Sequence, residues 1–465
     1  MEKSAGQNRK DELFYKAKHA CDIIDEQAVL TADEFCEGYK AFLDKAKTER
    51  EAVEEAVRLA KENGFTEFCA DKKYAAGDKV YLNNRGKSLI LAVFGKKALK
   101  EGVRVLAAHI DSPRLDLKPR PVYEDNEICL FKTHYYGGIK KYQWTAIPLA
   151  LHGVVVKKDG TKVNVCVGEN DTDPQFTVTD LLPHLAKDQM SKNLSEGIAG
   201  EALNILVGSR PFKDDEASEK VKLAVLDMLN NNYGITEGDF LSAEFEVTPA
   251  FKARDIGFDR SMIGAYGQDD RVCAYTALMA TLEAGIPEKT VVTVLADKEE
   301  TGSEGNTGMQ SHIFEFFIED IAATENTTAG RVLSNSQCLS ADVNAAFDPN
   351  YPEVMERNNA SYINHGVVIT KYTGARGKSS TSDASAEYMG EIRRILDGKN
   401  VVWQTGELGK VDQGGGGTVA MYIANLNVDV VDLGVPVLSM HAPLEVTSKI
   451  DVYMAYSAFD AFIKD

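Results

Sequence analysis

The chain has 465 residues, of which 71 are acidic and 52 basic, and its formal net charge is −19. This length exceeds that of a usual single domain, so two domains are expected. The negative charge disfavours binding to nucleic acid or to an anionic membrane surface. The seven scattered cysteines, never spaced as CxxC, argue against a disulfide framework and a thiolate zinc site. Any metal is therefore expected to use His and carboxylate ligands.

The first ten residues are polar and charged, without the apolar core of a secretory signal. No apolar run in the sequence is long enough to form a transmembrane helix. Together with thiols that suit a reducing compartment, these features favour a cytoplasmic protein.

The N-terminal part is predicted to be helical. Apolar spacing favours a helix over 13–24, and Thr31 with Glu34 three residues later is typical of a capping box at the start of the next helix. A third helix is expected over 49–63, ended by Gly64.

Two strands follow, and then the character of the chain changes. The strands over 87–94 and 103–110 are dense in Leu, Val, Ile and Ala, as in strands buried on both faces. From 119 to 248 the chain favours shorter strands and loops. Its clearest feature is a hairpin over 154–165 with Asp-Gly at the turn. Helices are expected within this region over 179–188 and 219–230.

Alternating helices and strands return in the C-terminal half. The expected elements are a helix over 273–284, strands over 291–296, 367–371 and 401–405, a helix over 384–396, and short strands over 429–433 and 437–440. This alternation predicts an α/β domain with a doubly wound, mixed and largely parallel sheet. Residues 1–118 and 249–465 would form it, and the β-rich region 119–248 would be inserted into it.

Acidic and imidazole side chains come directly after the buried strands, where the sites of open α/β sheets lie. His109 and Asp111 follow one strand, and they suit a metal ligand oriented by a carboxylate, or only an exposed turn. Glu299 and Glu300 follow the strand over 291–296. One could bind a metal while the other acts as general base, although a solvated acidic loop would look the same.

Three further residues lie at element ends and have open interpretations. Asp269 opens a helix together with Asp270, where it could bridge two metals or cap the helix. Asp342 could cap, turn or ligate, and His441 follows a short strand. The ordered set of His, Asp, Glu, Asp and His suits two zinc ions sharing a carboxylate.

The chain resembles the aspartyl and vacuolar-type aminopeptidases, a family of cocatalytic zinc metallopeptidases. The matching segments span nearly the whole chain and are 109–114, 267–271, 297–303, 340–342 with 349–351, and 439–441. The resemblance implies that the chain hydrolyses the N-terminal residue from peptides, with two Zn²⁺ per chain. Co²⁺ and Mn²⁺ would accept the same ligands.

The resemblance also implies roles for individual residues. It assigns His109 and Asp342 to one zinc, His441 and Glu300 to the other, and Asp269 to the bridge between them. It further implies that Glu299 is the general base, that Asp111 holds the base or a ligand in place, and that the Asp269–Asp270 peptide is cis.

Segment 181–186 is similar to a family segment whose histidine reaches the active site of a neighbouring subunit. The resemblance thus implies that His184 stabilises the scissile carbonyl, that region 119–248 is a dimerisation domain, and that dimers assemble into a tetrahedral dodecamer. Two segments depart from the aspartyl-specific members: 374–380, which contains Lys378, and Gly414–Gly417. An acidic or a neutral, Leu-type N-terminal residue therefore remains open. A dizinc deacylase acting on a non-peptide amide and a non-catalytic shell protein are the alternatives.

Overall fold

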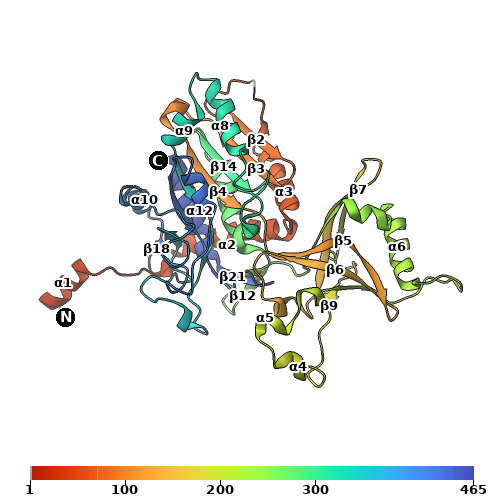
Figure 1. Ribbon diagram of the computed structural model, residues 1–465. Helices are drawn as coiled ribbons and strands as arrows, with labels where there is room; N and C mark the ends of the chain where they lie inside the picture. Colours follow the sequence, from red (N-terminus) through yellow and green to blue (C-terminus); the bar gives the residue numbers. More distant parts are fainter. Residues whose placement is uncertain (1–2, 71) are drawn as a thin grey trace.

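The computed structural model describes residues 3–70 and 72–465, and the strands of this part of the chain form three sheets. The largest has the order β1-β2-β3-β14-β4-β15-β19-β17-β18. Figure 1 labels β2, β3, β14, β4 and β18 of this sheet. Its strands are β1 (Thr66–Glu67), β2 (Lys79–Asn84), β3 (Ser88–Val93), β4 (Arg104–His109), β14 (Val291–Ala296), β15 (Gln337–Ser340), β17 (Val367–Thr370), β18 (Trp403–Thr405) and β19 (Asp429–Gly434). β14, β4, β15 and β19 pair in parallel, whereas β3 pairs antiparallel with both neighbours. The predicted mixed, largely parallel α/β sheet is confirmed.

Alternate residues of the buried strands belong to two hydrophobic cores, one on each face of this sheet. In β3, Leu89 and Leu91 pack into one core, and Ile90 and Ala92 pack into the other. The helices over the first core are α2 (Glu26–Lys45), α3 (Glu49–Glu62), α7 (Gln268–Leu282), α10 (Ala386–Gly398) and α12 (Lys449–Lys464), and those over the second are α8 (Ile313–Ala323), α9 (Ala329–Ser334) and α11 (Ala420–Ala424). This double burial explains why the central strands are continuously apolar.

A second sheet stands to one side of the first and is built from strands between residues 114 and 249 (Figure 1). Its order is β8-β7-β11-β5-β6-β10-β9. The strands are β5 (Arg114–Asp125), β6 (Ile128–Tyr136), β7 (Leu149–Val156), β8 (Lys162–Val167), β9 (Thr177–Val178), β10 (Ile205–Gly208) and β11 (Ala243–Pro249), with the helices α4 (Lys187–Met190), α5 (Leu194–Gly197) and α6 (Lys220–Tyr233). The expected hairpin is β7–β8. The domain bounds 119–248 stay a prediction.

A third sheet, with the order β12-β13-β21-β20-β16, was not predicted from the sequence. Its strands are β12 (Arg254–Ile256), β13 (Met262–Ala265), β16 (Asn344–Ala345), β20 (Pro436–Leu438) and β21 (Glu445–Ser448). β13 pairs with β21, so Ala265 lies opposite Glu445. This pairing brings the loop before α7 next to the loop that follows β20.

The structure corrects three predicted helices. The first helix is α1 (Ala5–Leu13), which projects from the body of the molecule (Figure 1), and 13–24 is not a continuous helix. Asp25 rather than Thr31 caps the next helix, because its Oδ1 accepts a hydrogen bond from the Ala28 amide and α2 begins earlier. Residues 179–186 are not helical, and only the short α4 begins at Lys187, because Pro183 lacks an amide donor and restricts the preceding residue. Among the described residues, no helix is both long and apolar enough to cross a bilayer.

Candidate metal centre

Asp269 lies between two imidazoles. Its Oδ1 is 3.2 Å from His109 Nε2, and its Oδ2 is 3.1 Å from His441 Nε2. One carboxylate thus faces both rings through different oxygens. This is the arrangement expected of a carboxylate that bridges two cations.

Three separate elements bring these side chains together. His109 ends β4, at the carboxyl edge of the large sheet, and His441 follows β20. Asp269 lies in the first turn of α7, where Asp269 and Asp270 have non-helical backbone angles. No side chain at the N-cap position of α7 makes a capping hydrogen bond, and the Asp269–Asp270 peptide is cis, as expected. The acidic pair is therefore not a simple helix cap.

Glu300 and Asp342 complete the set, one beside each imidazole. Glu300 Oε2 is 3.5 Å from His441 Nε2, and Asp342 Oδ1 is 4.0 Å from His109 Nε2. Two overlapping groups have potential ligand atoms within 4.8 Å of one another: His109, Asp269 and Glu300, and His109, Asp270 and Asp342. The structure thus gathers all five side chains that the sequence analysis assigned to metal, and it adds Asp270, which was not assigned.

The electrostatics of this cluster favour a bound cation. Burial raises the pKa of both Glu300 and Asp342 well above their ordinary values, and nearby carboxylates add to the shift. Burial alone would raise the pKa of Asp269, but hydrogen bonds from His109 and His441 lower it. Within the described residues, Glu300 Oε1 is also buried without a hydrogen-bond partner. Divalent cations would neutralise the repulsion and satisfy this oxygen, so the donor set fits zinc.

Glu299 stands beside the two imidazoles but farther from them than the bridging carboxylate. It begins a short 3₁₀ turn after β14, and its Oε2 is 3.9 Å from His109 Nε2. Burial raises the pKa of Glu299 to about 7, and the carboxylates of Asp269 and Asp111 act in the same direction. A carboxyl group with this pKa can gain and lose a proton near neutral pH.

Asp111 connects His109 to the turn that carries Glu299 and Glu300. Its Oδ1 is 3.2 Å from His109 Nδ1, and its two carboxylate oxygens accept hydrogen bonds from the backbone amides of Glu299 and Glu300, each at 3.1 Å. The Tyr136 hydroxyl donates a further bond of 2.8 Å to Asp111. Asp111 therefore fixes the orientation of one imidazole and of the acidic turn, as a carboxylate behind a metal ligand does.

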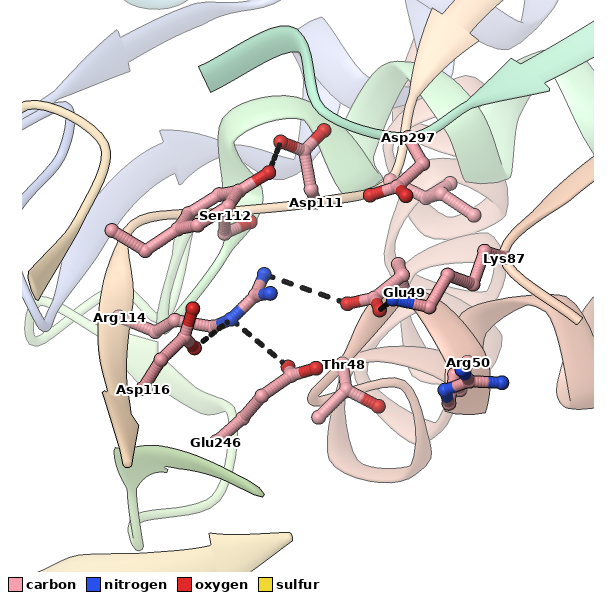
Figure 2. A network of polar contacts seen from close by, with 12 residues as sticks. Thr48, Glu49, Arg50, Lys87, Asp111, Ser112, Arg114, Asp116, Glu246 and Asp297 are labelled. Carbon is pink, nitrogen blue, oxygen red and sulfur yellow. Dashed lines mark hydrogen bonds and ion pairs between the residues drawn. The ribbon is translucent and has the colours of Figure 1, made fainter. Parts of the chain in front are cut away.

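A buried ion cluster lies beneath Asp111 and connects α3 to the second sheet (Figure 2). The Arg114 guanidinium is 2.8 Å from Asp116, 3.1 Å from Glu246 and 3.4 Å from Glu49. It also lies 3.9 Å from the ring centroid of Tyr136. Since Glu49 belongs to α3 and Glu246 to β11, this arginine ties the helical layer to the second sheet and supports the tyrosine that contacts Asp111.

The acidic cluster opens into a cavity of about 450 Å³. Its wall includes Val343, Leu408, Tyr422, Met440 and Gly415–Gly417, and no lining residue among those described is a lysine or an arginine. Lys378 does not line the cavity. Its ammonium contacts Asp383 at 2.8 Å and lies 3.7 Å from the ring centroid of Tyr372. The cavity thus combines an acidic floor with a largely apolar wall.

Comparison with known proteins agrees with this geometry. The family model of the aminopeptidase I zinc metalloproteases (M18) matches residues 42–463. The chain belongs to the M18 family of zinc aminopeptidases. A probable M18 family aminopeptidase 1 from Clostridium acetobutylicum is 51% identical over 463 residues, which cover 98% of this chain and all of the relative.

Solved M18 structures share the fold. An M18 aminopeptidase from Thermotoga maritima has a TM-score of 0.93 at 44% identity, and aminopeptidase I from Clostridium acetobutylicum has 0.91 at 50% identity. Each comparison covers 97% of this chain and 100% of the other. The S. cerevisiae mApe1 dodecamer has a TM-score of 0.76 at 21% identity over 94% of this chain and 97% of the other, and it shares the fold.

One predicted site residue of this M18 chain lies apart from the cluster. His184 is exposed in a turn of the second sheet's domain, and it is not among the residues that line the cavity. A role for His184 at this chain's own site has no support in the structure.

Besides Tyr136, the sequence analysis missed Glu445 as a positioning residue. Glu445 accepts a hydrogen bond of 3.0 Å from the Asp269 amide at Oε2 and one of 2.7 Å from the His441 amide at Oε1. Burial raises the pKa of Glu445 to about 8. It thus links the bridging carboxylate to the second imidazole through their backbones, and no sequence spacing signals such a contact.

Proposed function

We propose that this M18 chain removes the N-terminal residue from peptides at a centre of two zinc ions. The observation that carries the proposal is the position of Asp269, with one oxygen facing each of two imidazoles. His109 and Asp342 would hold one ion, His441 and Glu300 the other, and Asp269 both. When bound, zinc supplies Lewis-acid activation of water and of the scissile carbonyl.

In this proposal Glu299 carries the proton. It would accept a proton from the attacking water and deliver it to the amine that leaves, as a general base and then a general acid. Two features support the role: its carboxylate lies 3.9 Å from His109 Nε2, farther than the 3.2 Å of Asp269, and its backbone amide is held by Asp111. The mostly buried setting would keep bulk water from competing for the proton.

We expect substrates with a free α-amine and a neutral N-terminal side chain. An acidic side chain would enter the cavity without a lysine or arginine partner, and burying an unpaired charge is costly. Leu-type aminoacyl amides should therefore have a kcat/KM about 10-fold or more above that of Asp- or Glu-type amides. A cost of about 1.4 kcal/mol for burying the unpaired charge already corresponds to a tenfold difference.

The measurement is a hydrolysis screen over N-terminal residues, with N-acyl amino acids as comparison and with a chelator as control. The chelator should abolish turnover. A preference for acidic N-terminal residues would show that the cavity does stabilise a negatively charged side chain, contrary to this expectation. Hydrolysis of N-acyl amino acids without any of aminoacyl amides would favour the deacylase alternative.

His184 is proposed to act in the site of a neighbouring subunit, within a homodimer that assembles into a dodecamer in the cytoplasm. Its exposure on the second sheet's domain supports this, as does the shared fold of the mApe1 dodecamer. His184→Phe should lower kcat by about 10²–10³-fold if the imidazole stabilises the developing oxyanion. His312→Phe, at another exposed histidine, is the matched control.

Mixed oligomers test whether His184 acts across the interface. Co-expression of His184→Phe with Glu299→Gln should restore activity, because some sites would combine an intact Glu299 with a neighbour's intact His184. If the mixture stays as inactive as the single variants, action across the interface is wrong.

A further inference from the structure

A second group of metal-binding side chains lies away from the acidic cavity, where α3 meets the hairpin β7–β8. Glu51, His152 and Cys166 have potential ligand atoms within 4.8 Å of one another. His152 Nδ1 is 2.7 Å from Glu51 Oε1 and 3.7 Å from Cys166 Sγ. Because the three come from α3, β7 and β8, the spacing of the cysteines in the sequence does not reveal the group.

Backbone contacts of the fold position the side chains of this group. Glu51 Oε2 accepts hydrogen bonds from the Lys47 and Thr48 amides, which leaves Oε1 directed at His152. Cys166 is the ladder partner of His152 in the β7–β8 pair, so both side chains share a face of the sheet. The convergence is therefore built by the fold rather than by flexible surface chains.

The other nitrogen of His152 has a carboxylate partner. His152 Nε2 is 3.2 Å from Glu169 Oε1, and Glu169 Oε2 accepts a hydrogen bond of 2.7 Å from Lys252. With its Nε2 proton donated to Glu169, His152 can offer the Nδ1 lone pair to a cation lying between Glu51 and Cys166. Without a cation, the 2.7 Å contact between Nδ1 and Glu51 requires a proton on Nδ1. The Glu169–His152 pair is the usual support of a histidine that binds metal.

We propose that Glu51, His152 and Cys166 bind a divalent metal of the zinc type, separate from the aminopeptidase centre. In a tetrahedral zinc site the N and S ligands are about 3.6 Å apart and the N and O ligands about 3.4 Å apart. The His152–Cys166 separation fits directly, and the Glu51 carboxylate would turn outward by about 0.7 Å. Exposed Cys166 leaves the fourth position open to water.

A cation explains the convergence better than a proton does. A single proton on Nδ1 bridges His152 to Glu51 and leaves the Cys166 thiol without a role, whereas one metal ion contacts all three. The thiol and the imidazole nitrogen would each bind without a proton, so uptake releases protons. The bound ion would fasten α3, which covers the large sheet, to the hairpin of the second sheet.

Cobalt distinguishes this site from the aminopeptidase centre. The full chain is produced in zinc-depleted medium supplemented with Co²⁺, and its near-ultraviolet spectrum and cobalt content are measured. Thiolate ligation gives a sulfur-to-cobalt charge-transfer band, which the His and carboxylate ligands of the other centre do not produce. We expect this band and three cobalt ions per chain.

The band should disappear in Cys166→Ser, with the cobalt content falling to two, and persist in Cys69→Ser, which alters another exposed cysteine. A variant-free check is alkylation mapped by mass spectrometry, in which cobalt should protect Cys166 but not Cys69. Absence of the band in the unaltered chain, or its persistence in Cys166→Ser, overturns the proposal. So does equal alkylation of Cys166 with and without cobalt. The band, the protection from alkylation and the loss of one cobalt ion in Cys166→Ser all depend on Cys166. Failure of the proposed two-metal aminopeptidase centre would change the total cobalt content but not these three differences.

Discussion

Replacing Glu299 by glutamine is expected to lower kcat by about 10²–10⁴-fold, the usual contribution of a general base or acid. Glutamine keeps the size of the side chain but cannot take a proton from water. The carboxylate it replaces lies 3.9 Å from His109 Nε2, farther than the oxygen of Asp269. Bound zinc should therefore stay near the unaltered content. Steady-state kinetics and metal analysis of the same preparation check both statements.

Glu304→Gln is the matched control for this variant. Glu304 is an exposed carboxylate a few residues along the same loop, and its replacement should leave kcat within about 2-fold, as for ordinary surface substitutions. Near-normal turnover in Glu299→Gln would show that another group moves the proton. Loss of zinc together with activity would assign Glu299 to the metal ligands instead.

The convergence of the candidate metal ligands could be predicted in part because the large sheet is mostly parallel. Apolar runs marked β4 and β14 clearly, and parallel strands end at a common edge. His109 and Glu300, which lie far apart in the sequence, therefore had to approach each other. The sequence could not show the distances, since the loop after β20 that carries His441 is placed by the third sheet, whose short strands have little periodicity.

Two helix predictions failed for different physical reasons, one at the start of α2 and one over residues 13–24. Thr31 and Glu34 have capping-box spacing, but Asp25 caps the helix first, and the Thr31 hydroxyl donates to the Gln27 carbonyl from within α2. The apolar residues at the start of 13–24 include Leu13 and stay exposed, so no packing surface extends that helix.

The supporting residues escaped prediction for a different reason. Glu445 binds the backbone amide of Asp269, which lies far from it in the sequence, besides that of nearby His441, and Tyr136 binds the side chain of Asp111. Neither has a neighbour whose type or spacing would mark it. Glu51, His152 and Cys166 escaped in the same way, because the sheet register and a helix cap bring them together.

Asp269→Asn is expected to remove most of the bound zinc and with it nearly all activity. An asparagine side chain offers one oxygen, and its amide group cannot bind a cation. Whichever way it turns, only one of His109 and His441 would face an oxygen, so the bridge between the two ions would be lost. The zinc content of this variant should fall well below two per chain at the bridged centre.

Thermal unfolding with and without a chelator separates loss of metal from loss of folding. Zinc at about 1,000 times its Kd stabilises a protein by about 4.1 kcal/mol, so the unaltered chain should gain stability from zinc. Asp269→Asn should lose the part of this gain that comes from the bridged centre and keep only what an ion elsewhere, such as one at Glu51, His152 and Cys166, contributes. Its metal-free form should stay folded, because asparagine keeps the size and shape of the side chain. Asp432→Asn, at another buried carboxyl of the cavity, should keep the zinc-dependent gain. If Asp269→Asn gained as much from zinc as Asp432→Asn, Asp269 would not be the bridge.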